Sequence, residues 1–299
     1  MRLSRLLLLP VAALSVAACS DDDGVTVNAR PPLGGVRFVN AVADGGPVDI
    51  RMVDQVEWSA SSVNISTNYG LPFKFATTHW ATEAKARRIR VFPTDSNIAV
   101  TSQILHDTTI TVEANKNVTL MLVGSRAAGG SVRFITIDDT PPTLTGQQIA
   151  VRAVNAGVTG GIAAYIRPTA TSALAAPATW TIADTHGAGA YVVRDTGVFA
   201  VRAAAAATPL TAIASAAAPV GAPEASGVAA LAGYRGAGSA LGAFVFPRAC
   251  PGVALPLTAT NCPAARGRST AQITALGAPE LVWFIDRIPT PTPLATSTP

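Results

Sequence analysis

Two stretches of the chain nearly repeat each other: VRFVNAVADGG at Val36–Gly46 and VRAVNAGVTGG at Val151–Gly161. The copies agree at both valines, the arginine, the asparagine, an alanine and both glycines. Two later landmarks recur in the same order: a strand that meets a Gly-rich hairpin, and an apolar strand that ends in Asp and Pro. They are VTLMLVGSRAAGG (118–130) against VAALAGYRGAG (Val228–Gly238), and FITIDDTPP (Phe134–Pro142) against VWFIDRIPT (Val282–Thr290). Three landmarks in one order predict two tandem units, each with the repeated phrase as its first strand.

Short segments of alternating apolar and polar residues run through the first unit, as expected of strands with one buried face. Arg88–Phe92 and Thr109–Glu113 follow this pattern. Val118–Val123 is instead apolar on both faces, which predicts a central strand covered on both sides. With Gly, Pro, Asn and Asp between the strands, the pattern predicts an all-β fold: two tandem immunoglobulin-like β-sandwich domains after a lipoprotein signal peptide and a short tether.

One part of the second unit favours helix by composition alone. Residues 203–207 are all alanine, and 214–218 are nearly as rich in this strong helix former. Pro209, Pro219 and Pro223 would break such helices. We therefore expect short strands and loops with small side chains there.

The sandwich domains are expected at residues 36–140 and 149–289, joined by a Pro-containing linker at 141–148. The second domain has an insertion at 243–279 without a counterpart in the first. Residues 290–299, TPTPLATSTP, form a low-complexity tail that we expect to be disordered.

The N-terminus predicts export and lipidation. Two arginines precede LLLLPVAALSVAA, an apolar run that is too short to span a bilayer and is typical of a secretory signal. Small residues then lead into Cys19, as in the bacterial lipobox. Residues 1–18 are therefore predicted to be a lipoprotein signal peptide, and 19–35 a lipidated cysteine with a flexible tether. The alternative is an ordinary signal peptide with a chance cysteine. Because Ser20 follows the cysteine instead of Asp, we expect a lipid-anchored cell-envelope protein at the bacterial outer membrane.

The charge of the chain gives no support for nucleic-acid binding. The formal net charge is +4, and loss of Arg2 and Arg5 with the signal peptide lowers it to about +2. Only Arg87–Arg90 is locally basic, and its alternation with apolar residues predicts the solvated face of a strand. Charged residues make up 13% of the chain, which fits a β-rich exported protein better than a helical cytosolic enzyme.

Cys250 and Cys262 are the cysteines that remain besides Cys19. In an exported protein, such an isolated pair predicts one local disulfide, which would staple the extra inserted loop. A metal site is disfavoured, because no histidine lies near the pair and zinc takes four ligands.

The three histidines, His79, His106 and His186, lie far apart without metal-binding spacing, so we predict no metal and no cofactor. His186 closely follows Asp184, as a Ser/His/Asp hydrolase would allow, but the chain has no GxSxG motif. We therefore predict no catalytic residue and no enzymatic activity. The alternative from another class is an envelope hydrolase with an interdomain site, where His186 would meet an acid and a nucleophile.

Aromatic rings are the better lead for a binding site. Our candidate binding residues are Trp58, Tyr69 and Trp80, which fall with Phe73 and Phe75 in a loop-rich segment of the first domain. Sugar- and protein-binding faces often use such rings. The alternative is that most of these rings fill the core.

The asparagine of the repeated phrase, Asn40 in one copy and Asn155 in the other, precedes glycines. Asn commonly caps the backbone where the chain reverses, and we predict this role for both residues. The alternative is that they line a ligand site.

The pattern VRFVNAVADGGPVDI resembles the opening of a bacterial extracytoplasmic family, the domain of unknown function numbered 4397. In the second unit Thr159 and Ala164 stand where the family has acids, so a binding role of those acids would be lost there. The resemblance implies tandem immunoglobulin-like sandwiches on a lipoprotein anchor, and it implies no known activity. The matching positions are Arg37, Asn40, Ala41, Asp44, Val48 and Asp49.

These patterns together predict a non-catalytic, membrane-anchored envelope lipoprotein that acts in adhesion, scaffolding, or glycan or protein binding. Its expected partners are the membrane, through the N-terminal lipid, and a cell-envelope protein or polysaccharide. Nucleic acid is not expected as a partner.

Overall fold

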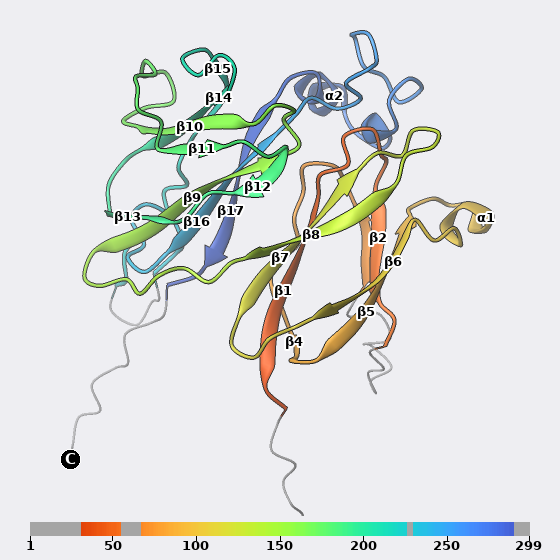
Figure 1. Ribbon diagram of the computed structural model, residues 1–299, viewed down its shortest axis with the longest axis horizontal. Coiled ribbons are helices and arrows are strands. Elements are labelled where there is room, and N and C mark those ends of the chain that lie inside the picture. Colours follow the sequence, from red (N-terminus) through yellow and green to blue (C-terminus); the bar gives the residue numbers. More distant parts are fainter. Residues whose placement is uncertain (1–30, 55–66, 226–229, 290–299) are drawn as a thin grey trace, which may run out of the picture.

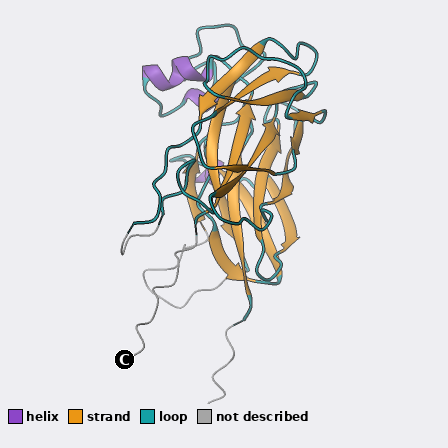
Figure 2. Ribbon diagram, turned by 90° about the vertical axis from the view of Figure 1, so that its left-hand side faces the viewer, coloured by secondary structure: helices purple, strands orange, loops and turns teal. Residues whose placement is uncertain are grey.

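The computed structural model describes residues 31–54, 67–225 and 230–289, and strands make up most of its regular structure (Figure 1). The helices in these residues are short: α1 (Ile98–Thr101), η1 (Pro263–Ala265) and α2 (Thr270–Leu276). Figure 2 shows how far the strands dominate the molecule. The all-β class predicted from the sequence is confirmed. Within the described residues, no helix is both long and apolar enough to cross a membrane.

The strands of the described residues form four sheets. Sheet A has the order β4-β1-β7-β8 and sheet B the order β3-β2-β5-β6. Sheet C has the order β12-β9-β16-β17, with β13 also paired to β9, and sheet D the order β11-β10-β14-β15. The strands are β1 (Leu33–Asn40), β2 (Val48–Met52), β3 (Thr67–Leu71), β4 (Trp80–Glu83), β5 (Ala86–Pro93), β6 (His106–Thr111), β7 (Asn117–Gly124), β8 (Val132–Asp138), β9 (Gln148–Ala156), β10 (Ile162–Arg167), β11 (Trp180–Ile182), β12 (His186–Ala188), β13 (Val192–Asp195), β14 (Ala200–Ala205), β15 (Ala212–Ala217), β16 (Ala240–Phe246) and β17 (Glu280–Arg287).

The two halves of the chain repeat one arrangement of strands. The repeated phrase forms β1 in the first half and β9 in the second, and these strands pair in parallel with β7 and β16. The structure thus places β16, and not Val228–Gly238, in the position of β7. The sequence comparison paired Val228–Gly238 with the β7 hairpin because both are rich in glycine. In the second half, however, the central strand β16 is followed by the insertion and not by a tight hairpin. The domain boundaries at 36–140 and 149–289 stay a prediction.

Three apolar cores separate the sheets into four layers. Sheets A and B enclose one core, which includes Phe38 and Ile50, and sheets C and D enclose another, which includes Val151 and Val201. The third core lies between sheets A and C and includes Met121 and Phe244. The layers therefore follow the order B, A, C, D, so that the two sandwiches pack against each other through their inner sheets.

Strand β7 confirms the prediction of a central strand covered on both sides. Leu120 and Leu122 face the core shared with sheet B, whereas Met121 and Val123 face the core shared with sheet C. The alanine-rich segments are also confirmed as strands, β14 and β15, because small side chains fit the closely packed interior of sheet D.

The insertion between β16 and β17 covers one end of the third core. It carries the Cys250–Cys262 disulfide, with the two Cα atoms 5.8 Å apart, and both cysteines are buried. The Cys250 amide donates to the Ala43 carbonyl at 2.9 Å, and Arg268 Nη2 donates to the Phe73 carbonyl at 2.7 Å. The predicted disulfide is present, and the inserted segment ties the second half to the first in addition to forming a loop.

The basic stretch on β5 is only partly a solvated face. Arg88 and Arg90 face outward and donate to Asp107. Arg87 is 2% exposed and donates to Glu83 at 3.3 Å, contrary to the sequence prediction. Because side chains alternate along a strand, Arg87 points to the same side as the buried Ile89, where an acid compensates its charge.

Candidate functional site

The arginine of the repeated phrase has the same role in both halves. Arg37 on β1 and Arg152 on β9 lie between sheets A and C with Asp139 and Asp286, and all four residues are at most 2% exposed. Arg37 Nη2 lies 2.7 Å from Asp286 Oδ1 and 3.3 Å from Asp139 Oδ2. Arg152 Nε lies 2.9 Å from Asp286 Oδ2, and its Nη2 donates to Asp139. Each arginine thus binds one acid of its own half and one of the other.

The strand registers show that the two acids occupy equivalent positions. In the first half, Thr119 pairs with Arg37 on one side and with Ile137 on the other. In the second half, Gly242 pairs in the same way with Arg152 and with Phe284. Asp139 and Asp286 each come two residues after those positions. Aligning the two proline-ended landmarks by sequence alone would instead pair Asp286 with Asp138.

Further polar groups complete this buried cluster. Thr119 Oγ1 and His79 Nε2 both bond to Asp139, and the Tyr191 hydroxyl donates to Asp286 Oδ2 at 2.7 Å. Burial alone would raise the pKa of the Asp139 carboxyl, but the hydrogen bond from His79 and the charges of Arg37 and Arg152 hold it below its usual value. Burial and the Asp286 charge raise the pKa of Tyr191. The cluster is enclosed and internally paired, so it joins the two sandwiches and offers no site for a ligand.

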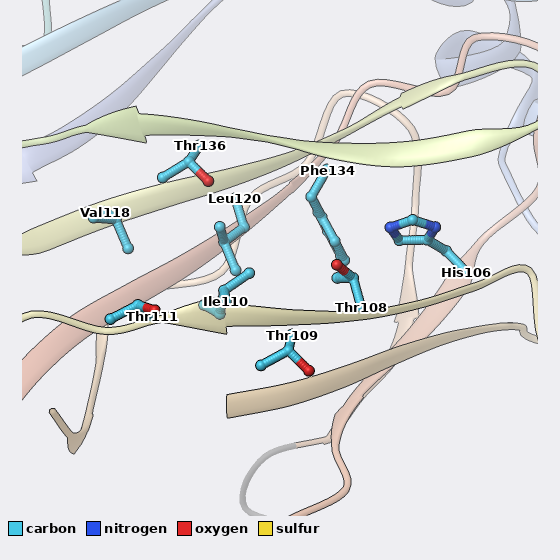
Figure 3. A pocket seen from close by; sticks show the side chains of 9 residues that line it. All are labelled: His106, Thr108, Thr109, Ile110, Thr111, Val118, Leu120, Phe134 and Thr136. Atoms are coloured by element: carbon cyan, nitrogen blue, oxygen red, sulfur yellow. The ribbon is translucent and has the colours of Figure 1, made fainter. Parts of the chain in front are cut away.

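An accessible cavity lies at the open margin of the first sandwich. It has a volume of about 270 Å³ and lies between sheet A and the edge strand β6 of sheet B; we call it the edge groove. Figure 3 shows Phe134 and Thr136 on one wall, with Thr108, Ile110 and His106 facing them. The groove is lined by His106, Thr108, Thr109, Ile110, Thr111, Val118, Leu120, Phe134 and Thr136.

The edge groove combines free hydroxyls with an aromatic wall. Within the described part of the chain, the side chains of Thr108 and Thr136 have no hydrogen-bond partner. The rings of His106 and Phe134 meet edge to face, with centroids 5.8 Å apart. Burial lowers the pKa of His106, against a smaller opposing effect of Asp107, so the imidazole is neutral at neutral pH. The lining carries no Asp, Glu, Lys or Arg, which suits a neutral ligand with hydroxyls and an apolar face.

The aromatic residues predicted as binding residues do not line this groove. Trp58 lies outside the described residues, and of Tyr69 the structure describes the β3 backbone. Trp80 on β4 is partly buried and packs edge to face on Phe38, with centroids 5.9 Å apart. Phe73 is buried in the third core.

The groove residues were missed because their signal is weak. HDTTIT reads as an ordinary strand, and threonines at alternate positions are common on half-buried surfaces. Thr108 on β6 and Thr136 on β8 face one cavity only because a gap remains between these two strands in the folded protein. A threonine in line with inward-facing apolar residues, as in Thr108 and Ile110, is the one hint the sequence holds.

The asparagines of the repeated phrase cap turns, as predicted. Asn40 Oδ1 accepts from the Val42 amide at 3.1 Å, and its Nδ2 donates to the Leu71 carbonyl at 2.9 Å. Asn155 Oδ1 accepts from the Val158 amide at 2.8 Å. Both residues are fully buried, so neither is available to a ligand.

The acids of the family pattern also hold backbone in place. Asp49 accepts from the Gly70 amide at 2.8 Å and from Thr94 Oγ1 at 2.6 Å. Ala164 faces the core of the second sandwich, whereas Asp49 faces away from the first core. Ala163, whose side chain faces away from that core, therefore takes the place of Asp49 in the second half. The sequence comparison had placed Ala164 there, one residue too far along.

A second cavity lies where the turns of both halves meet the insertion. We call it the turn pocket; its volume is about 350 Å³. His186, Asp44 and Ser125 all line it, as an interdomain hydrolase site would require. Ser125 Oγ donates to Asp44, however, and no described residue hydrogen-bonds to the His186 ring. The lining residues are Ala41, Ala43, Asp44, Gly124, Ser125, Gly157, Val158, Thr159, Thr185, His186, Pro247, Arg248, Pro251 and Pro279.

Comparison with known proteins supports the family resemblance and leaves the activity open. Residues 34–161 match the family described as "Domain of unknown function (DUF4397)", which confirms the resemblance over the first sandwich and the start of the second. No curated protein matches the chain. One similar solved structure is a family 26 carbohydrate-binding module, CBMbc of Eubacterium rectale Amy13K, in complex with maltoheptaose. It is 10% identical, covers 71% of this chain and 91% of its own, and has a TM-score of 0.19, a similarity too low to carry an inference.

Proposed function

We propose that the chain is a non-catalytic lipoprotein of the cell envelope that is anchored to the outer membrane through Cys19 and binds neutral glycan in its edge groove. The observation that carries the binding role is the groove between β6 and β8, with its free hydroxyls beside an aromatic ring. Adhesion or scaffolding at the cell surface would follow from such binding.

The chemistry of the groove favours a sugar over other ligands. Sugar rings present hydroxyls along their rim and an apolar C–H face, and protein sites meet them with polar groups beside an aromatic ring. Thr108 and Thr136 offer hydroxyls that both donate and accept, and Phe134 offers the ring. The lack of charge in the lining disfavours an anionic polymer.

The turn pocket supports the non-catalytic part of the proposal. A Ser/His/Asp hydrolase needs its histidine within hydrogen-bond reach of the serine. In the described part of the chain, Ser125 is bonded to Asp44 and the His186 ring has no hydrogen bond. Among the same residues, no group of three or more His, Cys, Asp or Glu is placed to hold a metal ion.

The binding role is tested with the soluble chain Ser20–Pro299 on arrays of neutral envelope polysaccharides, followed by calorimetry with the retained glycan. We expect Thr108→Val and Thr136→Val together to weaken binding about tenfold, since two hydroxyl hydrogen bonds are lost at nearly constant volume. Thr181→Val, an exposed threonine on β11, is the matched control and should bind as the wild type does. If the arrays retain no glycan, or if all variants bind equally well, the edge groove is not a glycan site, and a purely structural role of the protein becomes the better explanation.

The anchor is tested separately. Mass spectrometry of the mature protein from the membrane fraction should show a diacylated glyceryl group on Cys19, with Ser20 as the next residue. Cys19→Ser should move the protein out of the membrane fraction, because the N-terminal acyl chains are the expected means of attachment. An unmodified Cys19 in a membrane-bound wild type would contradict the anchor.

A further inference from the structure

The turn pocket differs from the edge groove in carrying opposite charges that are not paired. Asp44 and Arg248 both line it, and neither forms an ion pair within the described part of the chain. Charged groups that share one cavity without meeting each other can each bind a different part of one ligand. The pocket forms only because both sandwiches and the insertion contribute a wall.

Asp44 is held in place by hydrogen bonds from the turn between β7 and β8. Its carboxylate accepts from Ser125 Oγ, from the Arg126 amide at 3.0 Å and from the Ala127 amide at 3.2 Å. The Arg126 side chain also lies close enough to interact with its charge. A carboxylate has about four acceptor positions, so Asp44 can still accept from a ligand hydroxyl.

Arg248 is fixed by the loop that the disulfide closes. Its Nη2 donates to the Cys250 carbonyl at 3.2 Å and to the Val253 carbonyl. With Nη2 bonded to two carbonyls and Nε buried, the donors left for a ligand are those on Nη1, which can form a charge-assisted hydrogen bond to a carboxylate oxygen. No acid among the pocket-lining residues other than Asp44 competes for it.

Three further polar groups face the pocket with free hydrogen-bonding capacity. The Thr159 and Thr185 hydroxyls and the His186 ring have no hydrogen bond within the described residues. Burial lowers the pKa of His186, and the charge of Arg133 lowers it further, so the ring is neutral and can donate and accept at once. Alanine, valine and proline side chains supply apolar walls for a carbon skeleton.

We infer that the turn pocket binds a hydroxylated carboxylate, the chemistry of a sugar acid, with its carboxylate on Arg248 and its hydroxyls on Asp44, the two threonines and His186. A neutral sugar would leave the guanidinium of Arg248 without an anionic partner. A simple carboxylate such as acetate would leave Asp44 and the hydroxyls without partners. This site is separate from the edge groove and does not depend on glycan binding there.

The test titrates the soluble chain Ser20–Pro299 with sodium glucuronate, glucose and sodium acetate by calorimetry and by NMR shift changes. We expect saturable binding of glucuronate, with affinity for glucose and acetate lower by roughly tenfold or more, because each lacks part of the contacts. Arg248→Gln keeps an amide donor for the loop carbonyls but removes the charge, and should weaken glucuronate binding about tenfold. Thr185→Val gives a second variant that leaves the loop untouched, and is expected to weaken glucuronate binding severalfold.

The control is Thr108→Val in the edge groove, which should leave glucuronate binding unchanged and so separates the two sites. The inference is overturned if glucuronate shows no saturable binding, or if it binds no better than glucose. It is also overturned if folded Arg248→Gln and Thr185→Val both bind glucuronate as the wild type does.

Discussion

Replacing Arg152 with methionine is expected to lower the free energy of unfolding by about 3–5 kcal/mol, the usual effect of removing one partner from a buried ion pair. Arg152 is 2% exposed and bonds to both Asp139 and Asp286. Methionine fills a similar volume, but both acids would lose a cation and a hydrogen-bond donor in a place that water does not reach. The measurement is chemical denaturation followed by tryptophan fluorescence and circular dichroism.

Two further variants show whether the loss comes from the uncompensated charge. Arg88→Met removes an arginine that is bonded to an acid on the surface, and should change the free energy of unfolding far less, because water screens exposed ion pairs. Arg152→Met combined with Asp139→Leu removes one charge of each sign, and should be less destabilising than Arg152→Met alone. Equal effects of Arg152→Met and Arg88→Met would mean that the buried cluster contributes little.

Replacing Cys250 and Cys262 together with alanine is expected to lower the free energy of unfolding by about 3 kcal/mol, the value for opening a loop of this length. The loss arises mainly because the unfolded chain gains conformational freedom. The insertion packs against the core between the sandwiches. Faster amide hydrogen exchange should therefore follow at position 250, whose amide bonds to the Ala43 carbonyl, and near Phe73, whose carbonyl Arg268 contacts.

The reduced wild-type protein is the comparison for that variant. Reduction should produce the same loss of stability without changing side-chain volume, and the variant should then be insensitive to reductant. Full stability of the alanine variant would show that packing alone holds the insertion against the first half.

Much of the strand content could be predicted, because it depends on local periodicity. Val118–Val123 showed by composition that both of its faces are buried, and the prolines showed that the alanine-rich segments are not helices. The repeated phrase correctly marked the first strand of each half. What it could not show is that the two copies face each other, so that Arg37 and Arg152 join the halves.

The cavities could not be predicted, because they arise between segments that are distant in the sequence. Thr108 and Thr136 lie on strands of different sheets, and Asp44 and Arg248 line one cavity only because the insertion folds back over the turns. Arg87 illustrates the opposite error: a basic run suggests solvent, but strand alternation turns one of its members inward. Of the aromatic residues, Phe73 lies in a core and Trp80 packs partly buried against another, and the binding role of Trp58 and Tyr69 stays a prediction.

The exchange of contacts between the inner sheets has the reciprocity of a two-fold dimer. Arg37 reaches the acid of the second half while Arg152 reaches that of the first, as the same patch does on both subunits of an isologous pair. Here one polypeptide carries both subunits of such a pair. The contact between the two sandwiches therefore cannot be undone by dilution, and both sandwiches stay together at any protein concentration.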